Sequence, residues 1–162
     1  MDEVKTRQVN VRSINNESLK SMAKHICLPG KSPDRSTINC NVWSNIFGFD
    51  FPVEANFLEV KKRSLLLKQM EKHAHTPELV ISLNGPTIVP LAPAGDLGCS
   101  QENMLAVVLD QGEGLLLEPG TWHLAPFPVN DTAEVLVIYK KGTSQDDMVL
   151  EGLKPFVQLS LG

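Results

Sequence analysis

The second half of the sequence is a succession of short apolar runs separated by turn residues, and this pattern constrains the fold most. Each run has the length of a β-strand, and the runs cover residues 64–71, 79–83, 87–91, 105–110, 114–118 and 134–140. The breaks between them carry glycine, proline and asparagine, as in Asn84-Gly85-Pro86 and Pro119-Gly120. Many short strands at this spacing, with little helix, predict a β-sandwich or β-barrel.

One short helix is expected before this region, over residues 16–26, packed on the outside of the fold. Its apolar residues recur at helical spacing, and they are Leu19, Met22, Ala23 and Ile26. Asn15 or Asn16 can cap its first turn, and Pro29-Gly30 ends it. The fold class is therefore all-β, in one domain spanning residues 1–162, with a barrel core over about 60–141.

Composition and charge exclude several classes of protein. A length of 162 residues suits one domain, and a hydrophobic fraction of 42% is ordinary for a globular chain. A net charge of −4 gives no basic surface for nucleic acid or for an anionic membrane. The sequence has neither an apolar run that could span a bilayer nor the apolar segment of a signal peptide at its start. Cys27, Cys40 and Cys99 form no closely spaced pair, which favours a reduced, cytoplasmic protein.

Residues 31–60 are rich in large apolar residues at irregular spacing. They hold four of the 6 phenylalanines, while Gly48 and Pro52 interrupt any long element. Large aromatic side chains are usually buried, so simple core packing is one interpretation. The alternatives are that this segment closes one mouth of the barrel or meets a partner subunit.

Potential metal ligands gather between residues 71 and 78, in the run Glu71-Lys72-His73-Ala74-His75-Thr76-Pro77-Glu78. Residues two apart on a strand share a face. A strand through residue 75 would therefore turn its odd positions inward, and these include Arg63, Leu65, Leu67, Gln69, Glu71, His73 and His75. Lys68 and Lys72 would then face water, and Glu78 would return across the bend at Thr76-Pro77.

His123 follows the Pro119-Gly120 turn and is expected to join this group from a distant strand. Neutral imidazole and carboxylate suit Mn(II), Fe(II), Co(II), Ni(II) or Zn(II). No cysteine lies near these positions in the sequence, which argues against a structural zinc site. The sequence thus predicts a divalent metal held by His73, His75, Glu78 and His123, with its identity left open.

These residues resemble the two motifs of the cupin superfamily. The first motif is matched by the segment from His73-Ala74-His75 through Glu78 to Gly85, although its leading glycine is missing. The second is matched by Gly114, Pro119-Gly120 and His123. The resemblance covers roughly residues 64–140 and implies a cupin β-barrel of the jelly-roll type. Together with the aromatic segment, it also implies a homodimer.

Most of the chain also resembles the ureidoglycolate lyase family, which is itself cupin-like. The similar segments are Met70-Glu71-Lys72-His73, Gly112-Glu113-Gly114, Thr121-Trp122-His123 and Val135-Leu136-Val137-Ile138. This resemblance implies a small-molecule substrate and a metal-dependent cleavage of ureidoglycolate to glyoxylate and urea, a step of allantoin and purine breakdown.

Roles for further residues follow from this interpretation. The metal would lower the pKa of the substrate hydroxyl, and a carboxylate would remove its proton, with Glu71 the first candidate and Glu118 the second. Arg63 and Gln69 would hold the carboxylate or urea end of the substrate. Each role has an alternative. Glu71 can instead orient a histidine, Arg63 can be a solvated charge, and Trp122 can be a core residue rather than a substrate platform.

Two other classes of function remain open on sequence alone. One is a different metal-dependent cupin enzyme, namely a dioxygenase, isomerase or decarboxylase acting on a small organic acid or sugar. The other is a metabolite-binding or structural cupin without catalysis. Fold alone does not decide between them.

Overall fold

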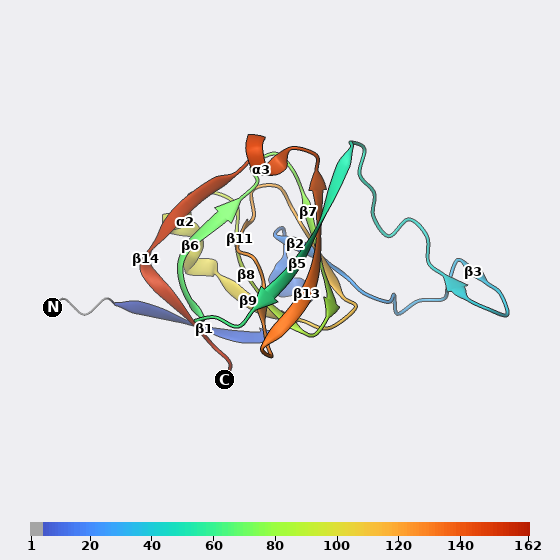
Figure 1. Cartoon of the computed structure of the whole chain (residues 1–162), viewed down its shortest axis with the longest axis horizontal. Coiled ribbons are helices and arrows are strands. Elements are labelled where there is room, and N and C mark those ends of the chain that lie inside the picture. The colour runs from blue at the N-terminus through green and yellow to red at the C-terminus, as the bar shows by residue number, and fades with distance from the viewer. Residues whose placement is uncertain (1–4) are drawn as a thin grey trace.

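The computed structural model describes residues 5–162, and every structural statement below concerns this part of the chain. Its larger sheet runs in the order β11-β6-β14-β1-β9-β8-β12, and β11 also pairs with β8. That extra pairing closes six strands into a ring, which is a mixed β-barrel (Figure 1). The strands are β1 (Thr6–Ser13), β6 (Leu66–Lys72), β8 (Thr87–Ala92), β9 (Leu105–Leu109), β11 (Trp122–His123), β12 (Phe127–Pro128) and β14 (Val149–Ser160).

A second, antiparallel sheet packs against one side of the ring, in the order β2-β10-β7-β13-β5. Its strands are β2 (Ala23–Ile26), β5 (Val53–Lys61), β7 (Glu78–Asn84), β10 (Gly114–Leu117) and β13 (Thr132–Lys140). Three short helices complete the fold, namely α1 (Asn16–Leu19), α2 (Leu97–Ser100) and α3 (Thr143–Asp146), together with the 3-10 turn η1 (Gln101–Asn103). No helix of residues 5–162 has the length and apolar character needed to cross a membrane.

The predicted all-β barrel with a short N-terminal helix is confirmed, and the six predicted strands correspond to β6, β7, β8, β9, β10 and β13. The barrel also includes strands outside the predicted range of residues 60–141, because β1 and β14 lie in its wall.

The predicted helix over residues 16–26 is wrong in its second half. Asn15 caps α1, since its side chain accepts a hydrogen bond from the backbone N–H of Glu17. The helix stops at Lys20, whose φ of 45° is incompatible with a helix. The chain then pairs with β10 as β2, because β10 offers an open sheet edge that satisfies its backbone.

Two apolar clusters fill the fold, and strand β8 of the larger sheet contributes to both. In β8, Ile88 and Ala92 pack in the cluster of the six-stranded ring, which also contains Trp122. Val89 and Leu91 point the other way, into the cluster between the ring and the second sheet. Both faces of β8 are therefore covered, and all of its residues are buried.

The strict alternation expected along residues 63–75 fails in β6. Leu67 and Met70 are three residues apart, yet both are buried in the cluster of the ring. The change of face lies opposite an irregularity in β14, where the register with β6 shifts between Gly152 and Val157. Such irregularities bend a strand and change the direction of its side chains. The alternation of inward and outward positions therefore cannot be extended across them.

Residues 27–52 form an arm that stands away from the barrel and carries the small hairpin of β3 (Arg35–Ser36) and β4 (Asn41–Val42) (Figure 1). Three phenylalanine rings of this arm pack against one another. Phe47 meets Phe49 edge to face with centroids 5.7 Å apart, and Phe49 lies 5.3 Å from Phe51. None of its residues belongs to either core cluster, so simple core packing is wrong for residues 31–52. It holds only at the end of the predicted segment, where Val60 of β5 is a core residue. Ile38 at its tip is fully exposed.

Candidate functional site

His73, Glu78 and His123 meet in the space between the two sheets, and all three side chains are buried. His73 follows β6, Glu78 begins β7, and His123 lies in β11 directly across from Glu71 of β6. The Glu78 Oε2 atom is 2.8 Å from His73 Nε2 and 3.7 Å from His123 Nε2. Three residues predicted as metal ligands are thus brought together.

Both histidine rings are turned so that Nε2 points into this cluster. His73 Nδ1 lies 2.7 Å from the carbonyl oxygen of Asp147, and His123 Nδ1 lies 2.9 Å from that of Thr121. A carbonyl only accepts, so each Nδ1 carries a proton. The neutral form of each ring would offer its Nε2 lone pair to an ion, whereas in the 2.8 Å hydrogen bond with Glu78 the protonated Nε2 of His73 donates to Oε2. The Nε2 atom of His123 is buried and has no hydrogen-bond partner.

The charges in the cluster are strongly coupled. Burial would raise the pKa of Glu78, but the neighbouring His123 and His73 outweigh it and lower the pKa to about 2. Burial would lower the pKa of His73 and of His123, but the contact of each ring with Glu78 outweighs it and raises both. At 3.7 Å the contact of His123 with Glu78 is electrostatic rather than a hydrogen bond. Glu78 is therefore ionised at neutral pH.

A cavity of about 140 Å³ opens beside the cluster. Its wall consists of Asn56, Leu58, Glu71, His73, Glu78, Ala125, Pro126, Val137, Tyr139 and Met148. Glu71 is only partly buried, and its Oε1 lies 3.8 Å from His123 Nε2. The cavity therefore places an accessible carboxylate next to the buried ligands.

The cluster fits a divalent metal ion. One ligand atom from each of His73, Glu78 and His123 lies within 4.8 Å of the other two. The orphaned, buried Nε2 of His123 needs a partner, and a cation among the three atoms would supply it. Two imidazoles and one carboxylate suit Mn, Fe, Co, Ni or Zn and leave positions open for substrate.

His75 is not part of this cluster. Its side chain is exposed and lines a different cavity beside α3, together with Asp147. β6 ends at Lys72, so residues 73–75 form a turn rather than a strand, and the alternation that would have directed His75 inward does not apply.

The second predicted base, Glu118, also lies elsewhere. It is exposed and borders a surface hollow with Lys20, Lys24 and His25. Its backbone N–H donates to the carbonyl of Met22, which ties the end of β10 to the segment before β2. Of the two predicted carboxylate bases, only Glu71 reaches the cavity.

The three residues predicted to bind substrate lie outside the cavity. The Arg63 guanidinium donates to the carbonyls of Ala125 and Pro126 and lies 3.7 Å from the centroid of the Phe127 ring. Arg63 therefore supports two residues of the cavity wall without lining the cavity itself. Gln69 is exposed, because β6 changes face before it. Trp122 alternates with His123 on β11 and is fully buried in the ring, which agrees with the alternative of a core residue.

Two residues of the site were missed by the sequence. Tyr139, the single tyrosine, lines the cavity with its ring 5.7 Å from that of His73. It lies in the predicted strand of residues 134–140. A polar aromatic residue in an otherwise apolar strand could therefore have indicated a position that lines the site. Asp147 lies in the acidic segment of residues 144–151, and nothing local in the sequence reveals that its carbonyl orients His73.

No protein-family model matches the chain, and no curated protein matches it in sequence. Solved structures do match. A 3,4-ketoisomerase from Helicobacter canadensis is 13% identical over 78% of this chain and 89% of that one, with a TM-score of 0.53. The sugar 3,4-ketoisomerase QdtA from Thermoanaerobacterium thermosaccharolyticum, in complex with TDP, is 16% identical over 80% and 88%, with a TM-score of 0.54.

A structure of a variant of QdtA in complex with TDP-4-keto-6-deoxyglucose also matches this chain. It is 17% identical over 78% of this chain and 86% of that one, with a TM-score of 0.51. At these identities the likeness concerns the fold. The comparisons and the closed ring of strands together show that this chain has the cupin β-barrel fold.

Proposed function

We propose that this protein is a metal-dependent enzyme that isomerises a small hydroxy-ketone of the sugar class by proton transfer. The observation that carries the proposal is the position of Glu71. Its carboxylate borders the cavity 3.8 Å from His123 Nε2, next to His73 and Glu78, which together with His123 would hold a metal. A base beside a cation is the arrangement that proton abstraction next to a carbonyl requires.

His73, Glu78 and His123 would hold the metal, which would polarise a substrate oxygen. Glu71 would take the proton from the carbon that bears the hydroxyl and return it to the former carbonyl carbon. The hydroxyl proton passes between the two oxygens, so atoms and charge balance. Tyr139 keeps its proton at neutral pH, because burial, helped by Glu54 and Glu78, outweighs Ser144 and raises its pKa. Its hydroxyl would donate a hydrogen bond to the substrate.

The size of the cavity limits what can enter. A volume of about 140 Å³ lies below the range of pockets for drug-sized ligands. Only the reacting part of a nucleotide-linked sugar would fit, with the remainder outside. The solved structures of similar fold are sugar 3,4-ketoisomerases, which favours this class of substrate.

Ureidoglycolate cleavage is the second candidate, and the small cavity favours it because such an acid would fit whole. Glu71 would again act as the base, now on the hydroxyl that becomes the glyoxylate carbonyl as urea leaves. Arg63 and Gln69 would have no part in binding, because neither lines the cavity.

The test begins with the protein loaded separately with Mn(II), Fe(II), Co(II), Ni(II) or Zn(II). Each form is incubated in D₂O with TDP-4-keto-6-deoxyglucose, and isomerisation and deuterium uptake at carbon are followed by NMR. Glu71→Gln should abolish uptake without loss of bound metal, whereas Glu118→Gln, at an exposed position, should leave it unchanged.

The other outcomes separate the remaining functions. Release of glyoxylate and urea from ureidoglycolate would support the second candidate. Oxygen consumption or loss of carbon dioxide with small organic acids would favour a dioxygenase or decarboxylase. Bound metal with none of these reactions would overturn the enzymatic proposal and favour a metabolite-binding cupin.

We also propose that the protein is a homodimer formed through the arm of residues 27–52. The arm carries large apolar side chains in water that neither core cluster covers, among them Leu28 and Ile38. Apolar patches of this kind commonly mark interaction surfaces. A second copy of the chain would cover them.

A further inference from the structure

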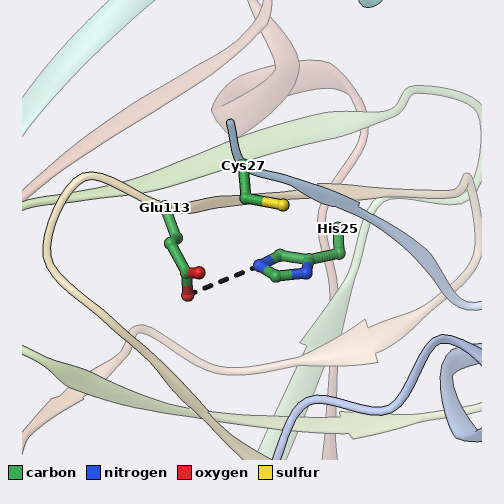
Figure 2. A group of neighbouring side chains, drawn as sticks. All are labelled: His25, Cys27 and Glu113. Carbon is green, nitrogen blue, oxygen red and sulfur yellow. Dashed lines mark ion pairs between the residues drawn. The ribbon is translucent and has the colours of Figure 1, made fainter. Parts of the chain in front are cut away.

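A second group of potential metal ligands lies at the open edge of the second sheet, whereas Glu71 lies in β6 of the larger sheet. It consists of His25 and Cys27 on β2 and just after it, and Glu113 just before β10 (Figure 2). Ile26 pairs with Gly114 and His25 with Leu115. This antiparallel register sets Cys27 across from Glu113, and places His25 on the same face two residues away.

The three side chains turn toward one another, with the Cys27 sulfur and the Glu113 carboxylate approaching the His25 ring from two sides (Figure 2). One ligand atom of each lies within 4.8 Å of the other two. His25 Nε2 is 3.4 Å from Glu113 Oε2. A nitrogen and an oxygen bound to one tetrahedral zinc ion, with bonds of about 2.1 Å, are also about 3.4 Å apart.

The His25 Nε2 atom is buried and makes no hydrogen bond, although the carboxylate is close. The carboxylate itself is oriented, because Glu113 Oε2 accepts a hydrogen bond of 3.1 Å from the backbone N–H of Asp110. An anchored carboxylate beside an unpartnered imidazole nitrogen is an arrangement in which a cation satisfies both.

The site is accessible to an ion from solution. A cavity of about 300 Å³ adjoins it, and its wall includes His25, Asp110 and Glu113. Cys27 is exposed, so its side chain is free to rotate toward the other two ligands. The cluster shares no residue with the one formed by His73, Glu78 and His123.

We propose that His25, Cys27 and Glu113 bind a second divalent transition-metal ion of the zinc class. Thiolate, imidazole and carboxylate are all ligands that zinc accepts, and three protein ligands leave a fourth position for water. A thiolate and a carboxylate together balance the charge of the ion, and the thiol proton is released on binding. The bound ion would fasten Cys27, where the arm of residues 27–52 begins, to the turn between β9 and β10.

The experiment measures metal stoichiometry and the Co(II) absorption spectrum of the reduced full-length protein. A thiolate bound to Co(II) gives a near-ultraviolet charge-transfer band, and the set of His73, Glu78 and His123 contains no sulfur. The band should therefore be present in the wild type and absent from Cys27→Ser. Cys40→Ser and Cys99→Ser, at the two other exposed cysteines, are matched controls that should retain it.

Zn(II) binding gives an independent measure of the same site. Cys27→Ser and His25→Ala should each lose one equivalent of bound Zn(II), and Zn(II) should protect Cys27, but not Cys40 or Cys99, from alkylation. Glu78→Gln disables the first cluster, and it should keep the charge-transfer band. This variant separates failure of the second site from failure of the proposed function.

Two results would overturn the proposal. One is a Co(II) spectrum of the wild type without a thiolate band. The other is a Zn(II) stoichiometry that Cys27→Ser and His25→Ala leave unchanged, which would mean that His25 and Glu113 form only an ion pair.

Discussion

The Nδ1 atom of His73 lies 2.7 Å from the backbone carbonyl oxygen of Asp147, across 74 positions of sequence. The side chain of the same aspartate accepts hydrogen bonds from the backbone N–H groups of Ala74 and His75 and from the hydroxyl of Thr76. One residue thus fixes both the ring of His73 and the turn that carries it. Asp147 acts through another residue and is a positioning residue.

Asp147→Ala should therefore weaken metal binding without removing a ligand. Loss of such supporting contacts typically costs 10–100-fold in metal affinity, and we expect about this loss because the turn of residues 74–76 is released. Titration with Co(II) or Zn(II) measures it. Asp146→Ala, at the exposed neighbour, is the control, and equal affinity in both variants would contradict the assigned role.

The stability of the metal-free protein should depend on pH through the cluster of His73, Glu78 and His123. The pKa of Glu78 is lowered from 4.5 to about 2, so its stabilisation is present above pH 4.5 and is lost as the pH falls toward 2. The pKa values of both histidines are raised above 6.5, so their stabilisation is complete below pH 6.5 and is lost as the pH rises through the folded values. The contribution of the cluster is therefore largest between pH 4.5 and 6.5.

A carboxyl whose pKa falls from 4.5 to about 2 contributes on the order of 3 kcal/mol to the free energy of unfolding. Glu78→Gln should remove this contribution. Urea unfolding in EDTA across the pH range measures the difference from wild type, with Glu118→Gln as the exposed control. A difference that stays constant from pH 3 to pH 8 would refute the proposed coupling.

Trp122→Phe should lower stability and leave the metal site intact. The indole N–H of Trp122 donates to the carbonyl of Gly95 at 2.9 Å, and the ring is fully buried in the core of the six-stranded ring. Loss of the hydrogen bond and of part of the packing should cost about 1–3 kcal/mol. Trp43→Phe, on the arm, removes a comparable bond to the Lys31 carbonyl and should change stability by less than about 0.5 kcal/mol.

The proposed homodimer predicts a change in mass when the arm is altered. Ile38→Ser at the arm tip should shift the protein toward monomer in light scattering, because Ile38 is fully exposed in the single chain. Its unfolding free energy as a monomer should not change, since Ile38 belongs to neither core cluster. Leu150→Ser, also at an exposed position but on β14, should remain dimeric. A monomeric wild type would disprove the proposal directly.

The sequence predicts the strands well because local composition governs them. The apolar runs between turn residues correspond to β6 through β10 and β13, and the segment from His73 to Glu78 with His123 contains the ligands that converge. Two errors share one cause. Gln69 and His75 were placed by alternation, which holds only in a regular strand, whereas β6 changes face and then ends at Lys72.

Other features depend on contacts between distant segments and have no local signal. Ala23–Ile26 has a helical pattern, yet it is a strand because β10 offers it an edge. The function of Asp147 depends on the path of α3 back over the turn after His73. His123 was correctly predicted to join the cluster from a distant strand, but its own strand, β11, has only two residues and gives no local strand pattern.

The position of β1 also has a consequence for how the chain folds. β1 lies between β14 and β9 and pairs in parallel with both. One edge of β1 therefore stays unpaired until β14, which follows all the other strands in the sequence, is available. Contacts between such distant segments are slow to form, and until they form the unpaired edges of β1 and β6 remain open to other chains. During synthesis the barrel therefore closes only after β14 has emerged, which makes this the stage at which aggregation and chaperone binding compete with folding.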